Sequence, residues 1–221
     1  MMIKKVKLVF TLVTAMYFFA ACNENSTTSN DTDKKDTTIS QTDKKDSRDM
    51  KMDNELMTSM NTMMDKTSSM KMSGDFDMDF ANMMIEHHQG AIEMSEQELK
   101  SGSDDKLKGM AQKIIAAQTE EIGKLKEIVK NSKASKMKMG DGELEKSMSE
   151  MKTAMSGMKM TGNINKDYAM MMITHHESAV SMFKMELKNG MNEQLKQIAQ
   201  KGISDQTKEI NEFKSWLSTN K

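Results

Sequence analysis

Proline is absent from the 221 residues, and the single cysteine, Cys22, lies close to the start of the chain. Aromatic residues make up only 5% and glycines number 11, whereas 29% of the residues are charged. This balance favours helices, because strands are rich in aromatic and β-branched residues. The formal net charge of −1 provides no strong basic field, so nucleic acid is not expected as a partner. The sequence therefore predicts an all-α protein.

The first residues have the layout of a secretory leader. Residues 1–7 are basic, and the apolar run from residue 8 to residue 19 is too short to predict a membrane span. Phe19-Ala20-Ala21-Cys22 follows, and a cysteine after two alanines predicts a lipoprotein signal peptide over residues 1–21 with lipidation of Cys22. The alternative is an ordinary secretory signal. A lipidated Cys22 would anchor the chain in the cell envelope, at a periplasmic or outer-membrane surface, and would leave no free thiol in an oxidising compartment.

Residues 22–50 are polar and of low complexity, so we expect a disordered tether there. The rest, residues 51–221, is predicted to be one helical domain built from two copies, about 51–133 and about 139–221. The copies align without a gap at an offset of 88 residues, seen in the four histidines His87, His88, His175 and His176. No other histidine occurs in the chain.

Apolar residues in each copy recur in steps of three and four, as on one face of an α-helix. Each copy is expected to hold a short Met-rich helix, then a helix with the histidine pair, then a third helix. Gly102 and Gly190 follow the histidine helices, and Asp104 and Asn192 are positioned to cap the third helices. Two helical hairpins that face each other would form a four-helix core with a pseudo-two-fold axis, flanked by short Met-rich helices. The expected inward stripes are Phe80, Met84, His87, Ala91 and Met94 in the first copy, and Tyr168, Met172, His175, Ala179 and Met182 in the second.

Methionine, with 29 residues, surrounds both histidine pairs. Di-iron bundles place a glutamate three residues before the ligand histidine, but here Met84 and Met172 occupy those positions. Thioether and imidazole suit Cu(I), and by the same softness Ag(I), better than zinc or iron. The alternative is that the methionines and histidines only pack a core. The predicted metal ligands are His87, His88, His175, His176, Met83, Met84, Met94, Met171, Met172 and Met182.

Four Met-Lys-Met segments lie outside the strongly apolar stripes, where we expect exposed, weak and exchangeable copper ligands. The alternative is a compositional drift toward methionine and lysine. These secondary ligands are Met50, Met52, Met70, Met72, Met137, Met139, Met158 and Met160. Separately, Gln118 and Gln206 fall on the inward stripes of the third helices. Their amides are predicted to bond either a ligand histidine ring or a neighbouring helix backbone.

The pattern aromatic-x-x-Met-Met-Ile-x-His-His-x-x-Ala-Ile/Val-x-Met, followed by Gln-x-x-Glu-Ile and a final Trp-Leu, resembles the secreted bacterial "domain of unknown function 305" family. The matching stretches are residues 83–94 and 171–182, then 118–122 and 206–210, with Trp216-Leu217 once. The resemblance implies a ferritin-like helical bundle in the cell envelope. Some Met-rich members are linked to copper binding and tolerance, which the resemblance carries over to the four histidines and their methionine neighbours.

The function predicted is an envelope-anchored protein that binds Cu(I) or Ag(I), with copper the favoured ion, and stores it or passes it to a partner protein. Catalysis is not predicted, because no Ser-His-Asp arrangement or glycine-rich phosphate loop is present. One alternative is a metal-dependent redox enzyme, which carboxylates near Glu86 and Glu177 would favour. Another is a Met-rich interaction module that binds no metal.

Overall fold

The structure is a computed structural model that describes residues 41–132 and 142–220, with side chains from residue 55 onward. These residues form helices and connecting turns without a strand, which confirms the all-α prediction. The predicted leader, Cys22, Met137 and Met139 lie outside the described residues. No helix in the described ranges is long and apolar enough to cross a bilayer. The helices are α1 (Gln41–Ser68), α2 (Phe76–Ser101), α3 (Asp105–Asn131), α4 (Glu143–Ser156), α5 (Ile164–Asn189) and α6 (Glu193–Thr219).

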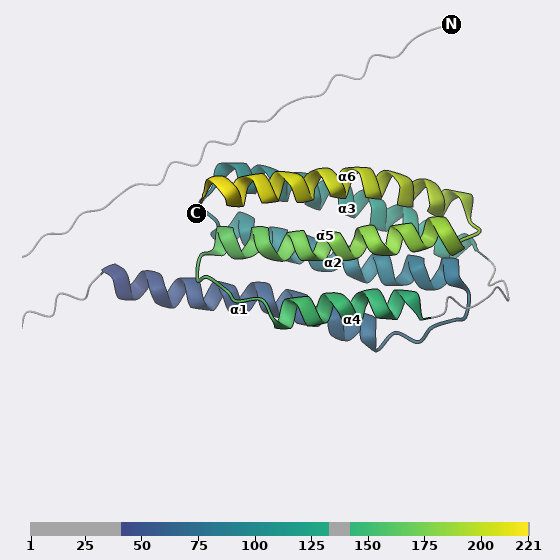
Figure 1. Ribbon diagram of the computed structural model, residues 1–221, viewed down its shortest axis with the longest axis horizontal. Coiled ribbons are helices and arrows are strands. Elements are labelled where there is room, and N and C mark those ends of the chain that lie inside the picture. Colours follow the sequence, from purple (N-terminus) through teal and green to yellow (C-terminus); the bar gives the residue numbers. More distant parts are fainter. Residues whose placement is uncertain (1–40, 133–141, 221) are drawn as a thin grey trace, which may run out of the picture. The chain divides into compact units, whose positions relative to one another are not determined.

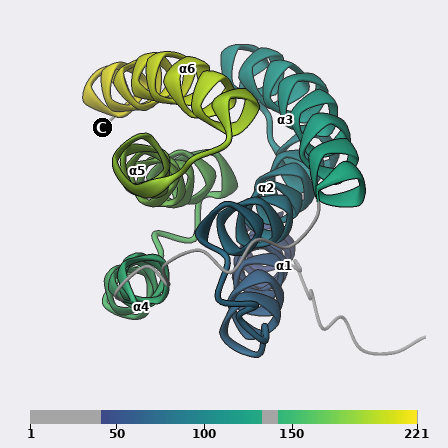
Figure 2. The same cartoon turned by 90° about the vertical axis from the view of Figure 1, so that its right-hand side faces the viewer.

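The helices form three layers of two (Figure 1, Figure 2). The middle layer is α2 and α5, one face of which carries α3 and α6 and the other α1 and α4. In chain order α2, α3, α5 and α6 run up, down, down and up, which is the topology of a ferritin-like bundle. The predicted four-helix core is therefore present, and the two Met-rich helices lie along its flank.

The sequence repeat is reproduced residue by residue in the fold. Helices α2 and α3 begin and end 88 residues before α5 and α6. The predicted caps are confirmed, because Asp104 accepts a hydrogen bond from the Leu107 amide (2.9 Å) and Asn192 from the Leu195 amide (3.2 Å). Gly102 and its counterpart in the second copy follow the last turns of α2 and α5, as the glycine signal indicated.

Helix α1 begins at Gln41, earlier than the sequence indicated. It includes the last ten residues of the segment predicted to be a disordered tether. Between residues 41 and 68 the chain contains neither glycine nor proline, so nothing in the sequence interrupts a helix that is anchored further along by Leu56 and Met60. The composition of this segment was typical of disorder, whereas helix continuity decides its conformation. Met50 and Met52 fall in this first part of α1.

Helices α2 and α5 cross in an antiparallel sense, and positions that differ between the two copies meet across the crossing. Phe80 lies against Phe183, with ring centroids 6.1 Å apart, and the Ser95 hydroxyl lies 2.9 Å from the Tyr168 hydroxyl. Phe183 in turn packs onto Gly202 of α6, where any side chain would collide with its ring. The two halves therefore differ in the residues that fill the core, although their backbones are related by the pseudo-two-fold axis.

Two buried carboxyl groups also repeat at the ends of α2 and α5. Glu98 and Glu186 have no exposed surface, and the Glu98 carboxyl folds over Gly102, where a side chain would collide with it. Burial, with Asp104 adding to it, raises the pKa of Glu98 to about 8. Burial, with Asp77 adding to it, raises the pKa of Glu186 to about 8. Both groups are thus protonated in the folded protein at neutral pH.

This protonation predicts a stability that falls with rising pH. Between about pH 4.5 and pH 8 these two carboxyl groups hold protons in the folded chain that the unfolded chain releases, so their contribution to the free energy of unfolding falls across this range by an amount on the order of a few kcal/mol. Replacing Glu98 and Glu186 together by Gln is expected to flatten the dependence. Denaturant unfolding at pH 7 and pH 8.5 measures it, with exposed Glu96→Gln on α2 as the control. An unchanged slope in the double variant would refute the assignment.

Candidate metal site

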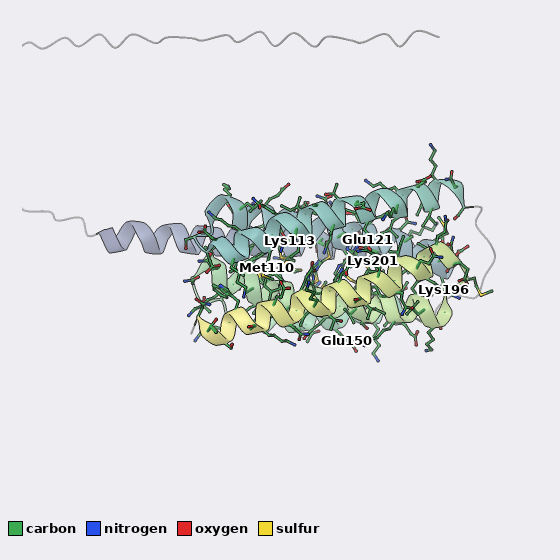
Figure 3. The ribbon with its side chains drawn as sticks, turned by 90° about the horizontal axis from the view of Figure 1, so that it is seen from above. Met110, Lys113, Glu121, Glu150, Lys196 and Lys201 are labelled. Carbon is green, nitrogen blue, oxygen red and sulfur yellow. The ribbon has the colours of Figure 1, made fainter. Side chains whose placement is uncertain are left out.

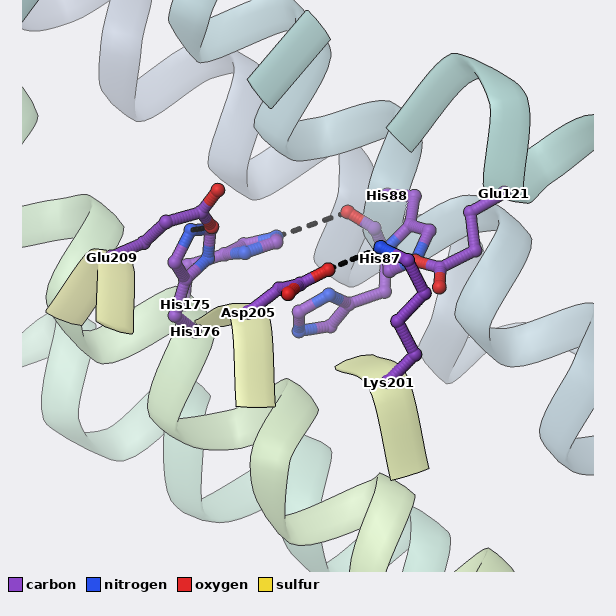
Figure 4. A network of polar contacts seen from close by, with 8 residues as sticks. All are labelled: His87, His88, Glu121, His175, His176, Lys201, Asp205 and Glu209. Carbon is purple, nitrogen blue, oxygen red and sulfur yellow. Dashed lines mark hydrogen bonds and ion pairs between the residues drawn. The ribbon is translucent and has the colours of Figure 1, made fainter. Parts of the chain in front are cut away.

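All four histidines converge where α2 crosses α5 (Figure 4). The rings of His87 and His175 are stacked, with centroids 3.7 Å apart and planes inclined by 41°. His88 and His176 flank this pair, with centroids 6.4 Å from His87 and 5.9 Å from His175 respectively. The sequence left open whether the histidines form one shared cluster or two separate ones, and the fold brings them into one.

The four imidazoles are fully buried. The His175 Nε2 lies 3.0 Å from the main-chain oxygen of His87, so it donates there, and this fixes the tautomer of His175. Within the described residues, neither ring nitrogen of His87 has a hydrogen-bond partner, and the Nδ1 atoms of His88, His175 and His176 also lack one. Buried polar atoms are seldom left without partners, and one nitrogen of each neutral ring carries a lone pair that a ligand could use.

Burial also decides the charge of the inner rings. Loss of water contact, followed by the proximity of the other histidines, holds the pKa of His87 well below its usual range. The pKa of His175 is lowered by the same burial, with His176 and His88 adding to it. Both rings are therefore neutral at physiological pH and keep the lone pairs that a metal ion requires.

Carboxylates from the outer layer hold the flanking rings. The His88 Nε2 is hydrogen-bonded to Glu121 of α3 at 2.8 Å. The His176 Nε2 lies 2.8 Å from Glu209 of α6, but the ring is not oriented for a hydrogen bond along this contact. A carboxylate on one ring nitrogen orients the imidazole. Sequence reasoning assigned no role to Glu121 and Glu209, even though they are 88 residues apart and lie at the edge of an apolar stripe.

Gln118 and Gln206 make neither of the predicted hydrogen bonds, to a ligand histidine ring or to a neighbouring helix backbone, in the described residues. They are buried one turn before the two glutamates, but in the described part of the chain both amide atoms of Gln118 and the Oε1 of Gln206 lack a hydrogen-bond partner. Of the residues in the Gln-x-x-Glu motif, the glutamate makes the contact with the histidine ring, not the glutamine. A helix turns about 100° per residue, so Glu121, three positions after Gln118, lies on the same face.

Every methionine predicted to be a primary ligand is buried in the core that encloses the histidines. These residues are Met83, Met84, Met94, Met171, Met172 and Met182. Another thioether side chain comes from α1. A Cβ added to Gly90 would lie 2.9 Å from the Met63 Cγ and 3.8 Å from the His175 Nε2, so Met63 reaches the cluster from the flanking layer. The sequence placed Met63 on a Met-rich helix but did not connect it with the histidines.

The two described Met-Lys-Met loops are more buried than predicted. Their lysines are exposed, but Met70, Met72, Met158 and Met160 are half-buried and pack against the core. Each loop is held to the next helix, because Asp79 accepts hydrogen bonds from the Ser73 and Gly74 amides (2.7 and 3.0 Å) and Asp167 holds the second loop in the same way. The polar lysines suggested exposure, whereas the alternation of the segment lets both methionines face inward.

The two carboxylates expected to favour an enzyme are paired with lysines. Glu86 pairs with Lys66 (3.3 Å) and Glu177 pairs with Lys214 (2.8 Å), both away from the histidine rings. Among the residues that have described side chains, no three His, Cys, Asp or Glu side chains are arranged to hold an ion by themselves. The potential donor atoms buried in this core are imidazole nitrogens and thioether sulfurs, which are the types that suit a soft, monovalent ion.

The fold and this cluster define an all-α, ferritin-like bundle in which two repeats bury four imidazole rings where they meet. The family model "Domain of unknown function (DUF305)" matches residues 21–129 and 129–217, so the chain belongs to this family, and the match separates the same two copies. No curated protein matches the chain.

Solved structures of CopM are similar to this chain. CopM in the apo form shares 27% identity over 65% of this chain and 96% of that chain, with a TM-score of 0.51. CopM in the Cu(I)-bound form and CopM in the Ag-bound form obtained by soaking each share 26% identity over the same fractions, with a TM-score of 0.50.

The fit of Met63 against Gly90 predicts that a methyl group is not tolerated there. Gly90→Ala is expected to lower the free energy of unfolding by about 1–3 kcal/mol, because the new Cβ would press on the Met63 Cβ and Cγ. Gly123→Ala in α3 meets no atom within 4 Å and is expected to raise stability by about 0.5–1 kcal/mol. Denaturant unfolding of both variants measures the difference, and equal effects would show that Met63 does not reach the cluster.

Proposed function

We propose that this protein binds Cu(I) or Ag(I) at the buried histidine cluster and stores the ion or passes it to a partner protein. The observation that carries the proposal is the stacked His87–His175 pair, with ring centroids 3.7 Å apart, at which both nitrogens of His87 lack a partner within the described structure. Buried methionines from both copies belong to the core that holds this pair. The likeness to CopM, solved with Cu(I) and with silver, supports the same ions here.

The charge of the site favours a monovalent ion. Thioethers and the neutral rings of His87 and His175 carry no formal charge, and the site is closed to water. An ion held by neutral ligands in a low-dielectric core keeps its full charge, so a single positive charge is much less costly to bury than two. Glu121 and Glu209 supply nearby negative charge through the outer rings, which offsets part of that cost.

The location proposed is the cell envelope, with the chain attached to a membrane through lipid on Cys22. The half-buried Met-Lys-Met loops lie nearer to water than the histidine cluster, and their weak thioether ligands would exchange ions with a partner. Storage needs the buried cluster, whereas transfer also needs ligands that a partner can reach. The core methionines are buried, which suits storage, and the loop methionines are half-buried, which suits exchange with a partner.

Removing the inner rings tests the buried site. His87→Ala combined with His175→Ala is expected to weaken Cu(I) binding at least about tenfold, equivalent to about 1.4 kcal/mol, because two neutral nitrogen donors are lost. Competition against a Cu(I) chelator under anaerobic conditions measures the affinity, and circular dichroism checks folding. The matched control is Gln89→Ala with Glu177→Ala, a pair at the same offset and next to the histidines. Equal chelator competition in both double variants would overturn the histidine site.

Replacing the loop methionines tests the exchange ligands. Changing Met70, Met72, Met158 and Met160 together to Leu keeps the half-buried packing but removes the sulfurs. The number of Cu(I) ions bound per chain is expected to fall, while the tightest affinity stays the same. Anaerobic titration with metal analysis measures both quantities, and exposed Met191→Leu is the control. Loss of the tightest site instead would move the primary site to the loops.

A further inference from the structure

The outer face of the bundle is hollowed along the line where α3 and α6 meet. Figure 3 shows Glu121 and Lys201 along this line. A cavity of about 620 Å³ lies at one side and one of about 170 Å³ at the other, with a small cavity of about 70 Å³ between them. Glu121, Lys124 and Lys201 line both the largest and the central cavity, and Asp205 and Glu209 line both the central and the third. The three cavities therefore form one groove with a narrow centre.

The floor of this centre leads to the histidines. Glu121 and Glu209 line it, with side chains 14% and 22% exposed, and each contacts a histidine that is completely buried. Each carboxylate thus touches water on one side and an imidazole on the other. On the opposite side of the middle layer, α1 and α4 cover α2 and α5 with buried methionines.

Two observations mark the centre of the groove as a place for a cation. Four carboxylates line it against two ammonium groups, so its net charge is negative. Ion pairs of Lys124 with Glu120 and of Lys201 with Asp205 hold two of the carboxylates, and the second of these pairs lies between Glu121 and Glu209 (Figure 4). Gln118, which is 97% buried, also lines this cavity, and its amide atoms have no partner in the described part of the chain.

We infer that the groove between α3 and α6 is the path by which Cu(I) enters and leaves the histidine cluster, with Glu121 and Glu209 as its transient ligands. The inference rests on the proposed function. A carboxylate is a hard ligand and binds Cu(I) weakly, so an ion attracted by the negative lining is not trapped there. The same carboxylates contact His88 and His176, which lie beside the stacked inner pair.

An ion thus passes from a weak oxygen ligand to nitrogen and then to the enclosed nitrogen and sulfur donors, with affinity rising at each step. No helix has to unfold for this passage, because the groove already reaches the carboxylates. The Lys201–Asp205 pair stands over the narrow centre, where it restricts the opening.

A plug in the groove tests the path. Ala117 is exposed and lines the central and the third cavity, whereas its neighbour Ala116 is exposed and lines none of the three. Ala117→Phe is expected to slow both uptake and release of Cu(I) at least about tenfold and to leave the equilibrium affinity within about threefold, because a path changes rates and not end states. Ala116→Phe is the matched control and is expected to keep wild-type rates.

Stopped-flow mixing of the Cu(I)-loaded full chain with excess chromophoric chelator gives the release rate, and the reverse transfer gives the uptake rate. Wild-type rates in Ala117→Phe would overturn the path, as would equal slowing by Ala116→Phe. A loss of affinity without slowing would also overturn it. If the unmodified chain takes up no Cu(I) at all, the proposed function fails and the path with it. Tight binding with rates insensitive to Ala117→Phe would remove the path alone.

Discussion

Burial of four imidazole rings at the crossing of α2 and α5 is the constraint on which the rest of the structure depends. A polar nitrogen withdrawn from water without a partner costs free energy, so a fold that buries several of them must recover that cost through surrounding apolar contacts. The methionine layers supply these contacts, and α3 and α6 supply two carboxylates. The third layer, α1 and α4, is explained in the same way, because without it the far side of α2 and α5 would face water.

Duplication supplies the site with its parts. His87 and His88 belong to one copy and His175 and His176 to the other, so neither copy holds the cluster alone. Phe80 pairs with Phe183 and Ser95 with Tyr168, at positions where the copies carry different residues, and these pairs favour one way for the copies to face each other. Two second copies would bring Tyr168 against Phe183, and two first copies would leave Phe80 against a serine. The differences between the copies thus favour their mutual pairing over pairing with themselves.

Sequence periodicity sufficed for much of this fold, because an uninterrupted 88-residue offset constrains both copies at once. The helical stripes, the caps at Asp104 and Asn192 and the inward position of His87 all follow from spacing along one helix. Glu121 and Met63 did not follow, because their roles depend on which helix lies opposite, and single-helix spacing carries no such information. The loop methionines and the start of α1 were misjudged from local polarity, which tertiary packing and helix continuity override.

The stacked His87–His175 pair lies on the pseudo-two-fold axis, and this has a consequence for anything held between the rings. A particle displaced toward one ring has a twin position beside the other, so the site offers two wells of nearly equal depth. The copies differ beside these wells, since Gly90 stands where the other copy has Ser178, with its buried hydroxyl oxygen. This hydroxyl, the Met63 side chain beside Gly90 and the one-sided hydrogen bond from His175 to His87 make the two positions unequal, so a particle held between the rings would favour one of them.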